Sequence, residues 1–246
     1  MRKVRIFHQG TGEGEQIVLD PENVHYVKDV LRLGEGSEVE VLSPSNEVYK
    51  GILIRDGRSY LVTNLVRLQT EPKNGPEINL YIGVIKGGAM DYAIEKASEI
   101  GATSITPVYC EYSSLRRITD ERLERFRRIA ISSALQCRRI PPLQVREAIG
   151  FDEIFCMKLN GNNLFLHPYS KDSLSNFFDR VADYSRPFNI FSGPEGGFSE
   201  KEVEQFVENG FFCASLGENI LRAETIPLVI CSIIIYEHSR RYPDGG

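Results

Sequence analysis

The stretch that decides the fold is IFSGPEGGFSEKEVEQF, residues 190–206, in which an apolar run leads into glycines and then into a helical pattern. Ser199 and Glu202 have the Ser-x-x-Glu spacing of a capping box, which predicts that a helix begins directly after the glycines. In open α/β sheets, ligands bind beyond the carboxyl ends of the strands, where such loops lie. We therefore expect a binding site at Gly193 to Gly197, with a tight turn packed on itself as the competing interpretation.

The chain from residue 77 onward alternates strands and helices around this stretch. INLYIGVI, TSITPVY, NLFLH and FFCASLG are typical strands, and the helical patterns between them predict a mostly parallel sheet covered by helices. The strand ends at 164–168 and 215–227 should lie beside the glycine loop, which matches neither common phosphate-binding glycine motif. The run after Thr225 is apolar on nearly every side and predicts a helix covered by a partner chain, with a central strand as the alternative.

The first seventy residues follow a different pattern. Short alternating strands surround one amphipathic segment, PENVHYVKDVLRL at 21–33, which predicts a small β-rich barrel with a single helix. The segment QTEPKNGP at 69–76 has two prolines and no periodicity, as linkers do. We therefore predict two domains, 1–70 and 77–246.

Charge and composition exclude several classes of protein. A net charge of -5 argues against coating nucleic acid indiscriminately, because that binding needs many basic residues, although arginines are locally in excess at 111–140. A solvated helix face is the alternative interpretation of that excess. The five scattered cysteines and four histidines have no metal-ligand spacing, so we expect no metal. The absence of a signal peptide or an apolar span predicts a cytoplasmic protein without membrane contact.

Several motifs together carry a family resemblance. KGGAMDYAIEKASEIGATSITPVYCEYSS, ALQCRRIPP, GPEGGFSEKEVE and LGENILRAETIP follow one another, and HYVKDVLRLGEGSEVEV precedes them. The chain resembles, over nearly its whole length, the RsmE family of ribosomal RNA methyltransferases in the SPOUT superfamily. The resemblance implies an α/β fold: a C-terminal SPOUT-type, mostly parallel sheet with a trefoil knot, preceded by a small PUA-like β-barrel domain. It also implies S-adenosyl-L-methionine as cofactor, a homodimer, and methylation of N3 of a uridine in small-subunit (16S) ribosomal RNA, either naked or in the assembled subunit.

The resemblance also implies how the cofactor is held. Backbone groups of the loops would contact its adenine and ribose, and leucine and isoleucine side chains would form apolar walls. The implied cofactor-binding residues are Leu166, His167, Gly193, Pro194, Glu195, Gly196, Gly197, Leu216, Gly217, Ile220, Leu221, Arg222 and Thr225. We expect alanine at Gly196 or Gly217 to impair binding more than folding.

Methylation at N3 requires that the uridine lose a proton, so the site needs a charge stabiliser and a proton acceptor. We predict these roles for Arg222 and Glu224, with a structural salt bridge of Arg222 to Glu224 or Glu195 as the alternative. Basic residues near the motifs would grip RNA phosphates, although each could be an ordinary surface charge. These predicted RNA-binding residues are Arg32, Lys86, Arg116, Arg117, Arg138 and Arg139.

The chain departs from the family pattern at Gly88-Ala89, at 136–139, and at Asn219, Ala223 and Ile226. These departures concern RNA contact more than the methyl donor. Other functions stay open: a SPOUT enzyme acting on transfer RNA or on a ribose hydroxyl, a non-catalytic RNA-binding assembly factor, and an enzyme acting on a free nucleotide.

Overall fold

The computed structural model describes residues 4–9, 16–57, 59–69 and 75–243, which form two compact units. Unit 1 contains the described residues within Met1–Lys73 together with Ala134–Pro141, and unit 2 contains those within Asn74–Ser133 and Pro142–Gly246. The predicted linker at 69–76 lies mostly outside the described residues, and the two predicted domain boundaries stay predictions. The grouping of Ala134–Pro141 with the N-terminal unit was not anticipated from the sequence.

Unit 1 is built on one mixed sheet with the order β1-β3-β4-β5-β2 in the described part of the chain. The β1–β3 pair is parallel and the other pairs are antiparallel. The predicted helix at 21–33 forms as two consecutive helical segments, α1 and the π-helical η1. Asp20 caps the start of α1, where its side chain accepts a hydrogen bond from the Asn23 amide. The elements are β1 Val4–Phe7, β2 Gln16–Val18, α1 Pro21–His25, η1 Tyr26–Val30, β3 Glu38–Leu42, β4 Val48–Asp56 and β5 Ser59–Leu68.

A buried ion pair crosses the parallel strands of unit 1. Arg5 on β1 lies in register with Glu40 on β3 and donates from Nε and Nη2 to Glu40 Oε2 at 2.9 and 2.8 Å. Their side chains are only 9% and 6% exposed. The other carboxylate oxygen of Glu40 lies 3.9 Å from Nη1 of Arg138, which belongs to the Ala134–Pro141 segment of the same unit.

Glu40→Gln is expected to destabilise unit 1 by about 3–5 kcal/mol, because removing one partner leaves the other charge buried without compensation. Glu38→Gln is the matched control, since Glu38 lies on the same strand and pairs with Lys50 at 2.7 Å, but both side chains are exposed. The Glu38→Gln variant should lose no more than about 1 kcal/mol of stability. Urea unfolding followed by circular dichroism measures both, and equal stability of the two variants would contradict the expectation.

Unit 2 contains a parallel sheet with the order β12-β10-β11-β6-β7-β8, and β9 also pairs with β7, among the residues that the structure describes. Each of these pairings is parallel, which confirms the predicted mostly parallel sheet. The trefoil knot implied by the resemblance stays a prediction. The strands are β6 Ile78–Gly83, β7 Ser104–Tyr109, β8 Gln144–Val145, β9 Ile149–Gly150, β10 Asn162–Leu166, β11 Phe188–Ser192 and β12 Phe212–Ala214.

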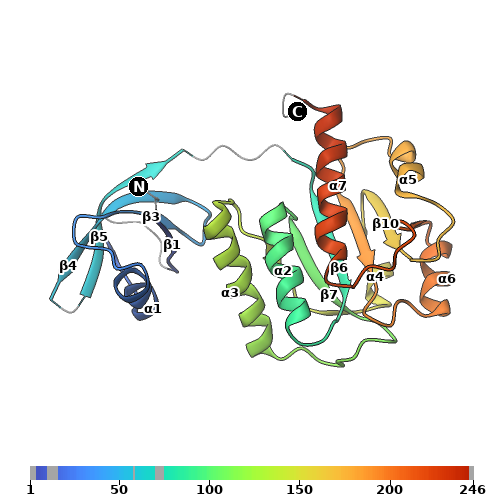
Figure 1. Cartoon of the computed structure of the whole chain (residues 1–246), viewed down its shortest axis with the longest axis horizontal. Coiled ribbons are helices and arrows are strands. Elements are labelled where there is room, and N and C mark those ends of the chain that lie inside the picture. Colours follow the sequence, from blue (N-terminus) through green and yellow to red (C-terminus); the bar gives the residue numbers. More distant parts are fainter. Residues whose placement is uncertain (1–3, 10–15, 58, 70–74, 244–246) are drawn as a thin grey trace. The chain divides into compact units, whose positions relative to one another are not determined.

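Successive strand residues point to opposite faces of the sheet. Both faces of this sheet carry apolar side chains, and helices cover each of them. Leu80 and Ile190 join the apolar core shared with α2, α3, α5 and α7, whereas Tyr81 and Phe191 face α4 and α6. Figure 1 shows α2 and α7 side by side over β6 and β7, and the two helices are in contact. The helices are α2 Gly88–Ile100, α3 Asp120–Cys137, α4 Glu153–Cys156, α5 Leu174–Arg180, α6 Glu200–Glu208 and α7 Ile226–Arg241.

The apolar run after Thr225 is thus the helix α7, and the alternative interpretation of a central strand is wrong. Its residues Ile230, Cys231 and Ile234 are buried, while other apolar positions such as Leu228 and Ile233 are only half-buried within the chain. Among the described residues, none of the helices has the length and apolar character needed to cross a membrane.

Candidate functional site

The carboxyl ends of β10 and β11 and the loop between β12 and α7 surround a cavity of about 710 Å³. This volume lies in the range of sites that bind cofactors and other small molecules. The predicted cofactor-binding residues, except Thr225, line this cavity, as do both predicted catalytic residues. The lining consists of Ala89, Leu166, His167, Pro168, Tyr169, Gly193, Pro194, Glu195, Gly196, Gly197, Phe198, Leu216, Gly217, Asn219, Ile220, Leu221, Arg222, Ala223, Glu224 and Ile226.

The glycine loop is held at its far end by the predicted capping box. Ser199 N donates to Glu202 Oε2 at 2.8 Å, and Glu202 N donates to Ser199 Oγ at 3.3 Å. The second carboxylate oxygen of Glu202 accepts from the backbone N of Glu111 at 2.8 Å, in the segment that follows β7. The cap therefore starts α6 and also fixes the loop against a neighbouring strand end.

Close packing within the chain requires glycine at two positions of the loop. A Cβ atom on Gly193 would lie 2.8 Å from the carbonyl carbon of Gly197, and one on Gly196 would lie 2.8 Å from Cβ of Tyr112. The loop is therefore a turn packed on itself and also a wall of the cavity, so both interpretations of the motif hold in part. Alanine at Gly196 is thus expected to disturb packing as well as binding.

Gly217 differs from these, since its φ is +120° and a Cβ there would meet nothing within 4 Å. Backbone conformation is the reason for glycine at this position. The expectation that alanine at Gly217 impairs binding more than folding stays a prediction.

The end of β6 is also fastened to the glycine loop. Glu195 Oε1 accepts from the backbone N of Lys86 at 2.8 Å, and a Cβ on Gly83 would lie 2.3 Å from N of Pro194. This contact places the segment after β6 at the cavity, where Ala89 contributes to the lining.

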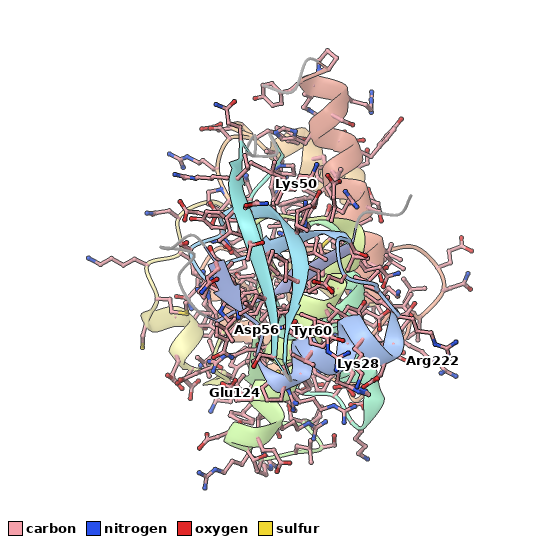
Figure 2. All side chains as sticks on the ribbon, turned by 90° about the vertical axis from the view of Figure 1, so that its left-hand side faces the viewer. Lys28, Lys50, Asp56, Tyr60, Glu124 and Arg222 are labelled. Atoms are coloured by element: carbon pink, nitrogen blue, oxygen red, sulfur yellow. The ribbon has the colours of Figure 1, made fainter. Side chains whose placement is uncertain are left out.

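The loop after β12 carries the two predicted catalytic residues. The side chain of Arg222 is 87% exposed and that of Glu224 is 21% exposed, and their Nη1 and Oε1 atoms are 3.9 Å apart. The Arg222 side chain is labelled in Figure 2. This separation fits the structural salt bridge given above as the alternative role of Arg222. An exposed ion pair of this kind stabilises the fold by about 1 kcal/mol or less. Arg222 thus keeps donors free to meet a ligand at the cavity mouth.

His167 and Thr225 have distinct environments. Burial lowers the pKa of His167 below its ordinary value of 6.5, so the imidazole that lines the cavity is neutral at pH 7. Thr225 stands at the beginning of α7, where its carbonyl accepts from the amide of Val229. Its place is the start of the helix that follows the cavity loop.

The predicted RNA-binding residues fall into two groups. Lys86, Arg116 and Arg117 are exposed in unit 2. Lys86 adjoins the glycine loop through Glu195, and the segment that holds both arginines also holds Tyr112, which lies against Gly196.

The second group belongs to unit 1 and contains Arg32, Arg138 and Arg139. Arg32 and Arg138 are exposed, but Arg139 is only 8% exposed. A buried guanidinium is poorly placed to grip a phosphate, so Arg138 is the better candidate of the adjacent pair. No group of metal-ligating side chains occurs in the described residues.

Sequence reasoning missed several lining residues. Pro168, Phe198, Asn219, Ala223 and Ile226 are direct neighbours of residues that were predicted, and Tyr169 is one position further along, so the continuity of each loop could have indicated them. Ala89 could not be found in this way, because it reaches the cavity only through the pairing of β6 with β11.

Comparison with known protein families identifies the class of protein. Residues 72–235 match the model of the RNA methyltransferase domain, and residues 19–65 match that of the RNA methyltransferase PUA domain. The chain therefore belongs to this family of RNA methyltransferases.

Individual relatives agree with the resemblance to the RsmE family. The chain is 29% identical over 206 residues to ribosomal RNA small subunit methyltransferase E of Rickettsia conorii, covering 82% of each chain. It is 26% identical over 245 residues to the protein of the same name from Bacillus subtilis, covering 95% of each. A ribosomal RNA small subunit methyltransferase E from Neisseria gonorrhoeae, solved bound to S-adenosyl methionine, matches with a TM-score of 0.83 and 26% identity, covering 94% of this chain and 96% of that one.

Proposed function

We propose that the chain is an S-adenosylmethionine-dependent methyltransferase that acts on N3 of a uridine in small-subunit (16S) ribosomal RNA. The observation that carries this proposal is the cavity at the strand ends of unit 2, which the predicted cofactor-binding and catalytic residues line together. The names of the relatives support the ribosomal substrate.

The cavity fits an adenosyl cofactor. Leu166, Leu216 and Leu221 provide apolar contact for a purine, and the glycine loop lines the same cavity. Adenosyl ligands combine flat apolar rings with polar sugar and amino-acid groups, which is the mixture that such pockets bind. A neutral His167 adds a polar group without a positive charge that would repel the sulfonium.

When bound, the cofactor supplies an electrophilic methyl group. The uracil gains an N3–CH₃ bond and loses its N3 proton as the sulfur–methyl bond breaks. Arg222 stabilises the negative charge that grows on the uracil as the proton leaves. Glu224 is the candidate proton acceptor, because it lines the same cavity and lies beside Arg222.

Exposed basic residues of both units hold the RNA. A base in a folded RNA must leave its stack to reach the cavity, so the protein must bind the flanking phosphates. Lys86, Arg116 and Arg117 meet this need in unit 2. In unit 1, Arg32 and Arg138 are the exposed candidates for phosphate contact, and Arg139 is the weaker one because it is only 8% exposed. A net charge of -5 restricts nucleic-acid binding to such local patches.

Methyl transfer from labelled S-adenosylmethionine to 30S subunits, naked 16S RNA and transfer RNA, all isolated from cells that lack this protein, tests the proposal. We expect one methyl group per 16S RNA and a reverse-transcription stop at one uridine, because an N3 methyl group blocks base pairing. Label in transfer RNA or in a ribose would contradict it. RNA binding without transfer would favour a non-catalytic assembly factor instead.

We also propose a cytoplasmic homodimer that uses α7, since apolar positions on this helix such as Leu228, Val229 and Ile233 remain half-buried in the single chain. Apolar area left partly exposed on one helix is typical of an interface. Sedimentation at micromolar concentration should give twice the mass of the chain, and a monomer would contradict this part of the proposal.

A further inference from the structure

Tyr169 is an exposed aromatic residue that lines the cavity. The residue is 77% exposed and still lines the cavity, whereas Leu166, three residues earlier, is 6% exposed. The Tyr169 ring meets the His167 ring edge-to-face, with centroids 5.8 Å apart and planes at 64°. This contact orients the tyrosine ring and leaves most of its surface available for another ring to stack on.

The turn that carries Tyr169 is fastened on both sides. Ser170 N donates to the His167 carbonyl at 3.1 Å and closes the turn, and His167 N donates to the Ala214 carbonyl at 3.0 Å. Ser170 Oγ donates to the Cys213 carbonyl at 3.2 Å and accepts from Asp172 N at 3.2 Å. The turn is thus pinned to β12, and the exposed ring is presented by a preorganised support, which lowers the entropy cost of binding.

We propose that Tyr169 is the platform on which a base of the RNA stacks when the target uridine enters the cavity. The inference rests on the proposed function and deepens it by naming a residue for the substrate side of the same site. Nucleobases stack face to face on exposed aromatic side chains. Because every base has such a face, this stacking depends little on the RNA sequence. A base must leave its stack in the RNA to reach the cavity, and stacking on the Tyr169 ring replaces the stacking on neighbouring bases that it loses.

The position of Tyr169 distinguishes this role from cofactor binding. On the turn that carries Tyr169, the predicted adenosyl-binding residues are the buried Leu166 and the half-buried His167, and Tyr169 lies further along the chain. Tyr169 is largely exposed, as is Ile220 of the loop after β12. The cofactor is therefore expected to occupy the inner part of the cavity, and the RNA base the outer part beside Tyr169.

Tyr169→Ala, Tyr169→Phe and the control Tyr92→Ala test the inference in the full-length protein. Tyr92 is also an exposed tyrosine, 41% exposed on α2, and it does not line the cavity among the described residues. The measurements are calorimetric affinity for S-adenosylmethionine, affinity for the 30S subunit with S-adenosylhomocysteine present, and kcat/KM for methyl transfer. Tyr169→Ala is expected to lower RNA affinity and kcat/KM about ten- to a hundredfold, the usual effect of losing one stacked base.

Cofactor affinity should stay within about twofold in every variant, and Tyr169→Phe and Tyr92→Ala should behave like the wild type. Unchanged RNA affinity in Tyr169→Ala would overturn the inference, and so would an equal loss of cofactor affinity, which would assign the ring to the cofactor. A change in sedimentation of Tyr169→Ala would also overturn it, by assigning the ring to a subunit interface. If the wild type binds 30S subunits without methylating them, the proposed function fails, while RNA affinity still decides the role of Tyr169.

Discussion

Arg222→Ala is expected to lower kcat for methyl transfer about a hundredfold or more, with the affinity for S-adenosylmethionine changed only a few-fold. Removing one donor that stabilises developing negative charge typically costs a factor of about 10² to 10³ in rate. The arginine lines the cavity but is 87% exposed, so it adds little to the cavity walls that hold the cofactor. Single-turnover methylation of 30S subunits measures the effect without a contribution from product release.

Arg186→Ala is the matched control for this experiment. Arg186 is also an exposed arginine, paired through Nε with Asp183 at 3.7 Å, and it does not line the cavity among the residues described. Its loss should leave the rate unchanged. If Arg222→Ala transfers the methyl group as fast as Arg186→Ala, the arginine has only the structural ion pair with Glu224, and the proposed charge stabilisation is wrong.

Gly83→Ala is expected to weaken S-adenosylmethionine binding about a hundredfold, although Gly83 itself does not line the cavity. The added Cβ would lie 2.3 Å from N of Pro194 and 2.7 Å from the carbonyl carbon of Gly193. Backbone atoms cannot rotate away as a side chain can, so the glycine loop must move off the end of β6. Such overpacking costs about 1–3 kcal/mol, and displacement of a binding loop by about 1 Å can cost a hundredfold.

Gly88→Ala serves as the control. Gly88 is the first residue of α2, shortly after the end of β6, and a Cβ there meets nothing within 4 Å. Isothermal titration of both purified variants measures cofactor affinity, and thermal unfolding shows whether each is folded. A folded Gly83→Ala protein with the affinity of Gly88→Ala would mean that the glycine loop does not need its contact with β6.

Local sequence patterns were sufficient to predict the sheet and the strand ends that meet at the cavity, and the family resemblance supplied the individual cofactor-binding residues. The alternation of strands and helices indicated a parallel sheet, and in such a sheet the carboxyl ends of the strands meet at one edge. Ser199 and Glu202 predicted the start of α6 because a capping box involves only neighbouring residues. Residues in the loops after β10, β11 and β12 could therefore be assigned to one site before their positions were known.

Features that depend on strand order or on burial could not be predicted in the same way. Gly83 reaches the glycine loop, and Ala89 the cavity, only because β6 pairs with β11, and no local pattern states which strands are neighbours. Arg139 is buried in the segment Ala134–Pro141, which is grouped with the N-terminal unit and in which Arg138 approaches Glu40. An arginine-rich motif gives no sign of which guanidinium is covered.

The most direct test of the central claim, that the cavity binds an adenosyl cofactor, is calorimetric titration of the purified protein with S-adenosylmethionine and S-adenosylhomocysteine. ATP, which carries the same adenosine with a phosphate chain, is the control ligand. We expect saturable binding of both adenosyl ligands and none of ATP, together with binding about a hundredfold weaker in Gly83→Ala. Equal binding of ATP would point to an enzyme of free nucleotides, and binding of neither adenosyl ligand to the folded protein would contradict the claim.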